Sequence, residues 1–215
     1  MDESSGTRKT WTPARWPVDK TAANQLRQWL DESGELEFDG LDLDFRSADL
    51  SDADFTESWL SRSDLRGVGL RQMVLYRGHA EEADFSGADM EGADLVRASL
   101  SRANFTGARL VDARLGRAEV LHAVFVDANL AGADFGDGSL SGSDLTGADL
   151  TAARANGLGL MGCRFDHTHV TGFHGTAIGP ITVSDQGKDV ELDGEDMEHW
   201  FARHGAEVTC VHHVE

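Results

Sequence analysis

The residues with the most obvious potential for chemistry form a histidine-rich stretch near the end of the chain. Asp166, His167, His169 and His174 lie within the segment RFDHTHVTGFH. Alternate residues on a strand share a face, and such an arrangement can chelate a metal ion. The repeat described below, however, places His167 and His169 on either side of a chain corner. We therefore interpret these residues as surface histidines, and we predict no metal site and no cofactor.

No catalytic group can be assigned elsewhere in the chain. The glycines of GDGSLSGSDLTGADL follow the repeat and no helix begins there, so this stretch does not match a loop that cradles phosphate. The two cysteines, Cys163 and Cys210, are too few for a disulfide framework. We interpret Cys163 as a small core residue. The sequence therefore predicts a protein that is not an enzyme and has no catalytic residues.

Aspartate is the polar residue whose spacing is most regular. If each residue number divisible by five from Phe45 to Val170 is taken as a central position, ten of the 26 residues directly before a centre are Asp. A short polar side chain beside a turn can accept hydrogen bonds from local backbone N–H groups. Most of these aspartates are therefore expected in any protein of this fold, and their distribution is more informative than their number.

A strict period of five residues predicts the architecture that positions these aspartates. All 26 central residues are apolar, and 22 of the 26 residues two positions earlier are small. In an extended segment these two positions face the same side, so the chain has to bend once per repeat to keep both inside. Ten of the 26 residues two positions after a centre are glycine, as expected for corners with positive φ. The period therefore predicts a solenoid.

The phenylalanines predict four sides for each coil. Five of the seven central phenylalanines share one position modulo twenty, and the other two lie ten residues out of phase, on the opposite side. Stacking like rings on like rings requires a twenty-residue coil, so the fold class is all-β, a quadrilateral β-helix. At roughly 4.8 Å per coil its length is about 31 Å. The five are Phe45, Phe85, Phe105, Phe125 and Phe165, and the two are Phe55 and Phe135.

The N-terminal end of such a coil needs a cap. We expect residues 1–40 to form a flexible arm followed by a small α-helical cap, with Trp11 and Trp16 as possible anchors of residues 1–17 on the coil. The helix is predicted over residues 20–32, with Asp19 as its N-cap and an end near Gly34. Residues 41–175 form the coil.

The C-terminal end, residues 176–215, is expected to form a β-α-β-like cap. Ile178, Ile181 and Val183 suggest a first strand, residues 194–204 a helix and residues 208–212 a final strand. The helix carries an apolar stripe that either closes the core or joins a second copy in a homodimer. The residues of the stripe, which are the candidates for dimerisation, are Met197, Trp200 and Phe201.

The negative charge is unevenly distributed. The formal net charge of −19 argues against direct binding of nucleic acid, because the long-range field repels polyanions. Two adjacent sides of the coil, centred on Phe45 and Leu50, hold −7 of the net −8 within residues 43–172. We therefore predict that a protein partner with a basic surface docks there. The candidate residues are Asp44, Asp49, Asp52, Asp64, Asp84, Asp89, Glu91, Asp144 and Asp149.

The repeat unit, written A-D-L-x-x or A-D-F-x-x as in residues 48–52 and 83–87, resembles the pentapeptide-repeat family. The resemblance covers about 130 residues and implies a right-handed quadrilateral β-helix. Well-understood members resemble DNA in size and charge, bind type II topoisomerases and protect DNA gyrase from quinolones or peptide toxins. Those members are usually dimers joined through a C-terminal helix. Because the register never slips, this chain is more like the members without projecting loops.

Two functions remain open. One is an acidic DNA mimic that binds DNA gyrase, as the resemblance implies. The other is a general protein-interaction scaffold with an unknown partner, motivated by outward-facing apolar residues. These residues are Tyr76, Val96, Leu121, Val124 and Val126. The N-terminus is polar, and no apolar run approaches the roughly 18 residues needed to cross a bilayer, so we expect a cytoplasmic protein that does not bind membranes.

Overall fold

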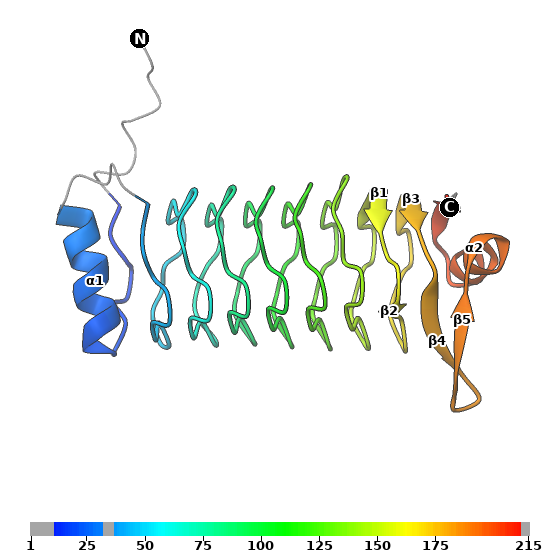
Figure 1. Cartoon of the computed structure of the whole chain (residues 1–215), viewed down its shortest axis with the longest axis horizontal. Helices are drawn as coiled ribbons and strands as arrows, with labels where there is room; N and C mark the ends of the chain where they lie inside the picture. The colour runs from blue at the N-terminus through cyan, green and yellow to red at the C-terminus, as the bar shows by residue number, and fades with distance from the viewer. Residues whose placement is uncertain (1–10, 32–36, 212–215) are drawn as a thin grey trace, which may run out of the picture.

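The computed structural model describes residues 11–31 and 37–211, and it is a rod of stacked four-sided coils (Figure 1). Parallel β-bridges join residues 20 positions apart on every side of the rod. Four such bridges recur in each coil, and this number of sides is the one that the phenylalanine spacing predicts. The bridges of the first full coil are Asp44–Asp64, Asp49–Gly69, Asp54–Val74 and Trp59–His79.

Each side of a coil is a short extended segment that ends in a tight turn. In the first turn, Ala48 N donates to Phe45 O at 3.0 Å, and Ser47 between them has a φ of 67°. The corner residues from Asp42 to Gly172 all have φ between 55° and 73°, whether they are glycine or not. This left-handed conformation costs an L-residue roughly 1–2 kcal/mol relative to glycine. A large side chain at a corner is therefore held there against its local preference.

The inward residues form one continuous core. Every central residue from Phe45 to Val170 is at most 1% exposed. Phe105 stacks on Phe85 and Phe125 with ring centroids 5.1 and 4.8 Å apart and ring planes within 5° of parallel. This spacing matches the distance of about 4.8 Å between paired strands. The predicted column of phenylalanines therefore exists along the middle of the rod.

The helix α1, Lys20–Asp31, lies across the N-terminal end of the rod (Figure 1). Asp19 caps it, because its Oδ1 accepts from Ala22 N at 2.8 Å. Leu26 is fully buried, and the ring of Trp29 stacks on that of Phe55 with centroids 5.6 Å apart. The predicted end near Gly34 lies outside the described residues.

The predicted anchors Trp11 and Trp16 are confirmed, and the described part of the arm, which begins at Trp11, is packed against the rest of the chain. Trp11 Nε1 donates to Ser51 O at 2.8 Å, and Arg15 forms an antiparallel bridge with Asp49. The ring of Trp16 lies under the guanidinium of Arg27, 4.6 Å from its centroid. These contacts fix the segment against the first coil and α1, and residues 1–10 lie outside the described part of the chain.

The C-terminal end continues the strand pairing of the coil. One parallel sheet has the order β1 (Arg154–Gly159), β3 (His174–Ile178), β6 (Glu207–Cys210). A second sheet has the order β2 (Cys163–Arg164), β4 (Ile181–Asp185), β5 (Lys188–Leu192), with β4 and β5 antiparallel. The helix α2, Gly194–Arg203, follows β5. Within the described residues, no helix has the length and apolar content needed to cross a membrane.

The structure corrects the predicted β-α-β order of this cap. The single expected first strand is two strands, β3 and β4, which belong to different sheets. The hairpin partner β5 was not predicted. Its turn contains Gln186 and Gly187 with φ of 51° and 77°, and Gly187 between alternating apolar residues is the sequence signal that identifies such a hairpin.

Candidate protein-binding faces

The nine predicted acidic residues lie on two adjacent sides of the rod and at one of their corners. We call these the Phe45 side and the Leu50 side, after their first central residues. Asp52 occupies the corner that follows the Leu50 side, with a φ of 62°. On the Phe45 side lie Asp44, Asp64, Asp84 and Asp144, and on the Leu50 side lie Asp49, Asp89, Glu91 and Asp149.

The aspartates that precede a central residue support the turns of the coil. Asp44 Oδ1 accepts from Arg46 N at 2.9 Å, and Asp144 Oδ1 accepts from both the backbone N and Oγ1 of Thr146, at 2.9 and 2.6 Å. The same bond to the residue two positions later recurs along both sides of the rod. This local role is the one predicted from the composition of the turns. This hydrogen bond occupies one oxygen of each carboxylate and leaves the other oxygen available for a further partner.

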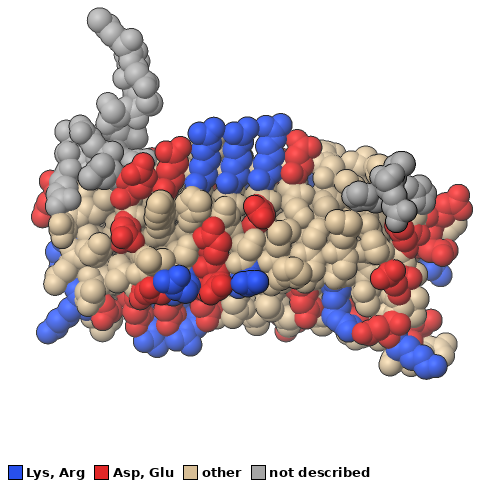
Figure 2. Space-filling view, in the orientation of Figure 1, with Lys and Arg blue, Asp and Glu red and all other residues tan. Residues whose placement is uncertain are grey.

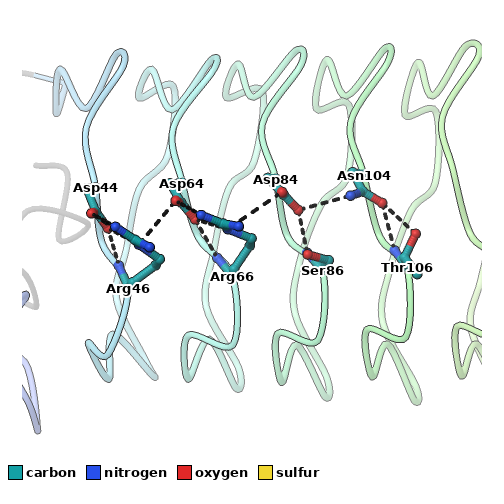
Figure 3. Close-up of polar contacts among 8 residues, drawn as sticks. All are labelled: Asp44, Arg46, Asp64, Arg66, Asp84, Ser86, Asn104 and Thr106. Atoms are coloured by element: carbon teal, nitrogen blue, oxygen red, sulfur yellow. Dashed lines mark hydrogen bonds and ion pairs between the residues drawn. The ribbon is translucent and has the colours of Figure 1, made fainter.

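On the Phe45 side, arginines bridge these carboxylates from coil to coil (Figure 3). Arg46 Nη2 lies 2.6 Å from Asp44 Oδ2, and Arg46 Nε lies 3.2 Å from Asp64 Oδ2 in the next coil. Arg66 repeats the pattern with Asp64, at 2.6 Å, and with Asp84, at 3.8 Å. Hydrogen bonds from Arg46 and Arg66 lower the pKa of Asp44 and Asp64, respectively. We call this run of residues the arginine ladder.

A second network neutralises carboxylates on the Leu50 side. Arg71 Nη1 lies 3.2 Å from Asp89 Oδ2, and Arg71 Nη2 lies 2.6 Å from Glu91 Oε2. Arg71 lies in the coil before these two acids, and Arg109, in the coil after them, pairs with the same two carboxylates. The hydrogen bond from Arg109 is the main cause that lowers the pKa of Glu91. The two arginines therefore balance the two acids.

The predicted acidic faces thus contain two kinds of carboxylate. Five of the nine are paired with arginine: Asp44, Asp64, Asp84, Asp89 and Glu91. The other four form no ion pair among the described residues: Asp49, Asp52, Asp144 and Asp149. Summing charge over a whole side concealed this difference. Comparing residues 20 positions apart in the sequence reveals most of it, because such residues are neighbours on adjacent coils. Asp144 is the exception, since its neighbour Arg164 pairs with Asp166 and Asp189 instead.

One acidic residue of this region, Asp127, was not among the candidates. It occupies the corner between the Phe45 and Leu50 sides, with a φ of 56°. A Cβ built on Gly147, the corner of the next coil, would collide with Asp127 Oδ1. The carboxylate therefore lies over Gly147, between Asp144 on one side and Asp149 on the other. We call Asp127, Asp144 and Asp149 the acidic edge, and no base pairs with them in the described part of the chain.

The predicted dimer contact is corrected for two of its three residues. Met197 and Phe201 are fully buried within the chain, and Phe201 packs on Phe165 and Phe173 with ring centroids 5.7 Å apart in both pairs. They close the C-terminal end of the core and have no surface left for a second copy. Trp200 is half-buried, so a homodimer through the C-terminal segment stays a prediction that rests on Trp200.

The histidine-rich stretch lies at the surface near the C-terminal end. His167 occupies a corner with a φ of 56°, and His169 and His174 are exposed. Nδ1 of His174 lies 2.9 Å from the carbonyl oxygen of Gly172 in its own segment. Over residues 11–31 and 37–211, no three His, Cys, Asp or Glu side chains gather closely enough to hold a metal ion.

Cys163 is buried in the core, where its Sγ donates to Leu140 O at 3.0 Å. Burial raises the pKa of the Cys163 thiol to about 12, so the thiolate is scarce at neutral pH. This environment fits the interpretation of Cys163 as a core residue. Cys210 on β6 is half-buried, and desolvation and the nearby Glu198 raise its pKa to about 12.

The repeat is matched by the family model for pentapeptide repeats, in eight copies over residues 42–68, 81–119 and 128–166. The chain is a pentapeptide-repeat protein. Membership assigns the coil of this pentapeptide-repeat protein to the right-handed quadrilateral β-helices. A comparison with curated protein sequences finds no match.

Solved structures of pentapeptide-repeat proteins resemble this one. A trypsin-treated variant of QnrB1, described as a plasmid-mediated fluoroquinolone resistance protein, aligns with a TM-score of 0.54 and 20% identity, over 79% of this chain and 88% of that one. HetL from Nostoc sp. strain PCC 7120, described as involved in heterocyst differentiation regulation, aligns with a TM-score of 0.30 and 21% identity, over 86% and 91%. The likeness to QnrB1 shows a shared fold.

Proposed function

We propose that this pentapeptide-repeat protein is a non-enzymatic interaction rod that binds a protein partner with a basic surface. The observation that carries the proposal is the acidic edge, where Asp127, Asp144 and Asp149 surround one corner of the coil and form no ion pair with any described residue. Arg164 lies beside Asp144 in the next coil and attracts it, but its ion pairs are with Asp166 and Asp189. Backbone hydrogen bonds hold Asp144 and Asp149 in place. Carboxylates fixed in this way attract cationic groups at little cost in reorganisation.

As the partner we propose a type II topoisomerase, DNA gyrase. Two observations support this choice: the fold is shared with QnrB1, a fluoroquinolone resistance protein, and the net negative charge of the rod is concentrated on two adjacent sides. In this proposal the chain mimics part of the charge of a DNA segment and protects gyrase from quinolones or toxins. The arginine ladder restricts the mimicry to the unpaired carboxylates, at the acidic edge and at Asp49 and Asp52.

A supercoiling assay with purified gyrase, with and without a fluoroquinolone, tests the proposal. We expect the chain to inhibit gyrase or to protect it from the drug. Replacing the acidic edge with lysine (Asp127→Lys, Asp144→Lys, Asp149→Lys) should abolish the effect. The matched control, Glu119→Lys with Asp185→Lys and Asp196→Lys, changes net charge equally at exposed acids elsewhere and should retain it. Absence of any effect of the unmodified protein on gyrase rejects this partner.

A second candidate, an interaction scaffold for an unknown partner, is favoured by an apolar hollow near the N-terminal end of the rod. Trp59 and Leu41 are 48% and 41% exposed. Together with His79, whose ring meets that of Trp59 edge-on at 5.4 Å, they line a hollow of about 230 Å³. Of the predicted outward apolar residues only Val124 is classed as exposed, at 36%, and the others are half-buried. The Trp59 hollow is therefore the better candidate for an apolar contact.

The two candidates differ in the surface that the partner covers. Crosslinking followed by identification of the captured protein, with the unmodified chain, the acidic-edge variant and Trp59→Ser in parallel, separates them. A partner lost with Trp59→Ser but retained by the acidic-edge variant supports the scaffold. The reverse pattern supports the acidic edge. A chain that captures nothing in any form contradicts both.

A further inference from the structure

One corner of the rod carries an excess of basic charge in its middle coils. It lies diagonally opposite the corner between the Phe45 and Leu50 sides, and its residues in consecutive coils are Glu57, Arg77, Arg97, Arg117 and Asp137. We call it the Arg97 corner. Figure 2 shows three basic side chains standing side by side along one edge of the rod, with acidic side chains at both ends of the row. This order of charges, with acids only at the ends, is unusual for the rod.

The neighbouring corner of the same molecule shows what a balanced column looks like. There the charges alternate from coil to coil, through Asp42, Arg62, Glu82 and Arg102. Arg62 Nη2 lies 2.7 Å from Asp42 Oδ2, and Arg102 Nη1 lies 3.5 Å from Glu82 Oε1. Each arginine of this column has an acid in the adjacent coil. The fold therefore allows corner charges to be paired across coils, and at the Arg97 corner only the first and last of the three arginines are paired in this way.

The pairing at the Arg97 corner is weak at its ends and absent in the middle. Arg77 Nη1 lies 3.5 Å from Glu57 Oε1, and Arg117 Nε lies 3.4 Å from Asp137 Oδ2. Arg97 forms no ion pair with any described residue. Exposed pairs of this kind contribute little and are easily exchanged for another partner. Arg97 therefore has its donors free for a ligand, and the donors of Arg77 and Arg117 are engaged only in exposed pairs at the two ends of the row.

A hollow in the surface lies directly beside the arginines of this corner. Its volume is about 340 Å³, and its charged lining is three arginines, Arg97, Arg114 and Arg117, and two acids, Asp134 and Asp137. Gly116 and Gly136 lie in it at positions where the preceding coils carry Tyr76 and Val96. A Cβ built on Gly116 or Gly136 would meet nothing closer than 3.4 Å. The missing side chains thus leave open space for an apolar group beside the row of cations.

The spacing of the arginines selects among acidic ligands. Three consecutive coils advance by about 9.6 Å, given roughly 4.8 Å between paired strands. Residues i and i+7 of an α-helix are about 10.5 Å apart along its axis, with i+4 between them. Alternate residues of an extended strand advance about 13 Å over the same three side chains. Acids on one face of a helix therefore match the column, and acids on a strand do not.

The acids at both ends of the corner select against a continuous polyanion. Glu57 and Asp137 occupy the coils directly before and after the three arginines. A nucleic acid strand laid along the corner would bring further phosphates against these carboxylates, and the net charge of −19 repels it at long range. A segment with only three acids avoids the contact with these carboxylates and, because it carries fewer charges, is repelled less at long range.

We propose that the Arg97 corner binds a helix of a partner protein that presents acids at positions i, i+4 and i+7. The acids pair with Arg77, Arg97 and Arg117, since guanidinium groups bind carboxylates with directed pairs of hydrogen bonds. An apolar side chain of the same helix fills the hollow over Gly116 and Gly136. This surface is separate from the acidic edge, and it binds its ligand whether or not gyrase is a partner.

Fluorescence anisotropy with a labelled, alanine-based helical peptide tests the proposal. The peptide carries Glu at i, i+4 and i+7 and one Leu on the same face, and a permuted peptide of equal composition spreads the same residues around the helix. We expect the first peptide to bind more tightly. Arg97→Ala should weaken binding by up to about fivefold, the effect of one exposed ion pair. Arg102→Ala in the balanced corner should leave the affinity unchanged.

Two further measurements complete the test. Gly116→Leu fills the hollow without a change of charge and should also weaken binding. Ala152 has a φ of 59°, close to the 61° of Arg97, so Arg97→Ala keeps the corner conformation, and circular dichroism should show an unchanged coil. Equal affinity for both peptides, or no effect of Arg97→Ala, overturns the proposal. Equally tight binding of a single-stranded DNA oligonucleotide also overturns it.

Discussion

Arg66 joins two coils of the rod through two carboxylates. Its Nη2 lies 2.6 Å from Asp64 Oδ2 in its own coil, and its Nε lies 3.8 Å from Asp84 Oδ2 in the next. Arg46 makes the same connection one coil earlier. The charge on this side is therefore arranged as a ladder along the rod axis, and it is only partly available to a partner.

Arg66→Ala should raise the pKa of Asp64 towards its ordinary value. The hydrogen bond from Arg66 is the main cause that lowers the pKa of Asp64 in the folded chain. A lowered pKa stabilises the folded state above the unfolded pKa, near 4, and this contribution is lost as pH falls through the folded value. An NMR titration of the Asp64 carboxyl should show the rise in the variant, with Arg97→Ala as a control that leaves it unchanged. An unaltered titration contradicts the ladder.

Phe105→Ala should be among the most damaging substitutions in the coil. Phe105 is fully buried and stacks on Phe85 and Phe125. Removing a buried ring costs about 3–5 kcal/mol, because the cavity that remains cannot fully collapse. Guanidinium denaturation followed by circular dichroism should show a large fall in the midpoint. Phe105→Leu should cost less, since Leu is the commonest central residue. An equal loss of stability in Phe105→Ala and Phe105→Leu shows that the stacking of the rings matters more than the volume that the side chain fills.

Gly78→Ala should destabilise the coil by crowding its core. Gly78 occupies an inward position, and a Cβ there would lie 2.7 Å from Leu75 Cγ and 3.1 Å from Ser58 O. Overpacking of this kind costs roughly 1–3 kcal/mol. Gly87→Ala is the control, because a Cβ at that corner meets no atom within 4 Å and its strain is about 1–2 kcal/mol. Guanidinium denaturation followed by circular dichroism measures both variants, and a Gly87→Ala variant less stable than Gly78→Ala contradicts the packing explanation.

Trp200→Glu tests the predicted homodimer. Trp200 is the one candidate residue that is only half-buried, and its ring meets that of Phe165 at 6.0 Å. If the C-terminal segments pair, this variant should be a monomer in light scattering while the unmodified chain is a dimer. Trp59→Glu, at the other end of the rod, should not change the mass. An unchanged mass for Trp200→Glu rejects α2 as the interface.

The coil could be predicted because its determinants are local and repeated. The inward positions show the bend at each corner, and the phenylalanines show which residues stack, since Phe85, Phe105 and Phe125 are in contact. Each additional coil repeats the same evidence. The β4–β5 hairpin occurs once, and its signal is limited to the turn around Gly187, which explains why it was missed.

The candidate site could be predicted only in part, because ion pairs depend on distances of a few ångströms. The sequence indicates which side of the rod carries Asp89 and Glu91, but their charge is cancelled by Arg71 and Arg109 from neighbouring coils. Similarly, the stripe of α2 shows that Met197 is an inward residue without showing which surface covers it. The surface that covers Met197 is the C-terminal end of the core of the same chain.

The unbroken register has a consequence for how the chain can change length. Paired residues lie 20 positions apart on every side, so inserting or removing one whole coil shifts everything beyond it along the axis and keeps each side chain in phase. A change of one repeat instead rotates the remainder of the rod by a quarter-turn. The Arg97 corner would then be continued by residues of another corner, and the C-terminal cap would face a new direction. The spacing of the binding surfaces can therefore vary only in whole-coil steps.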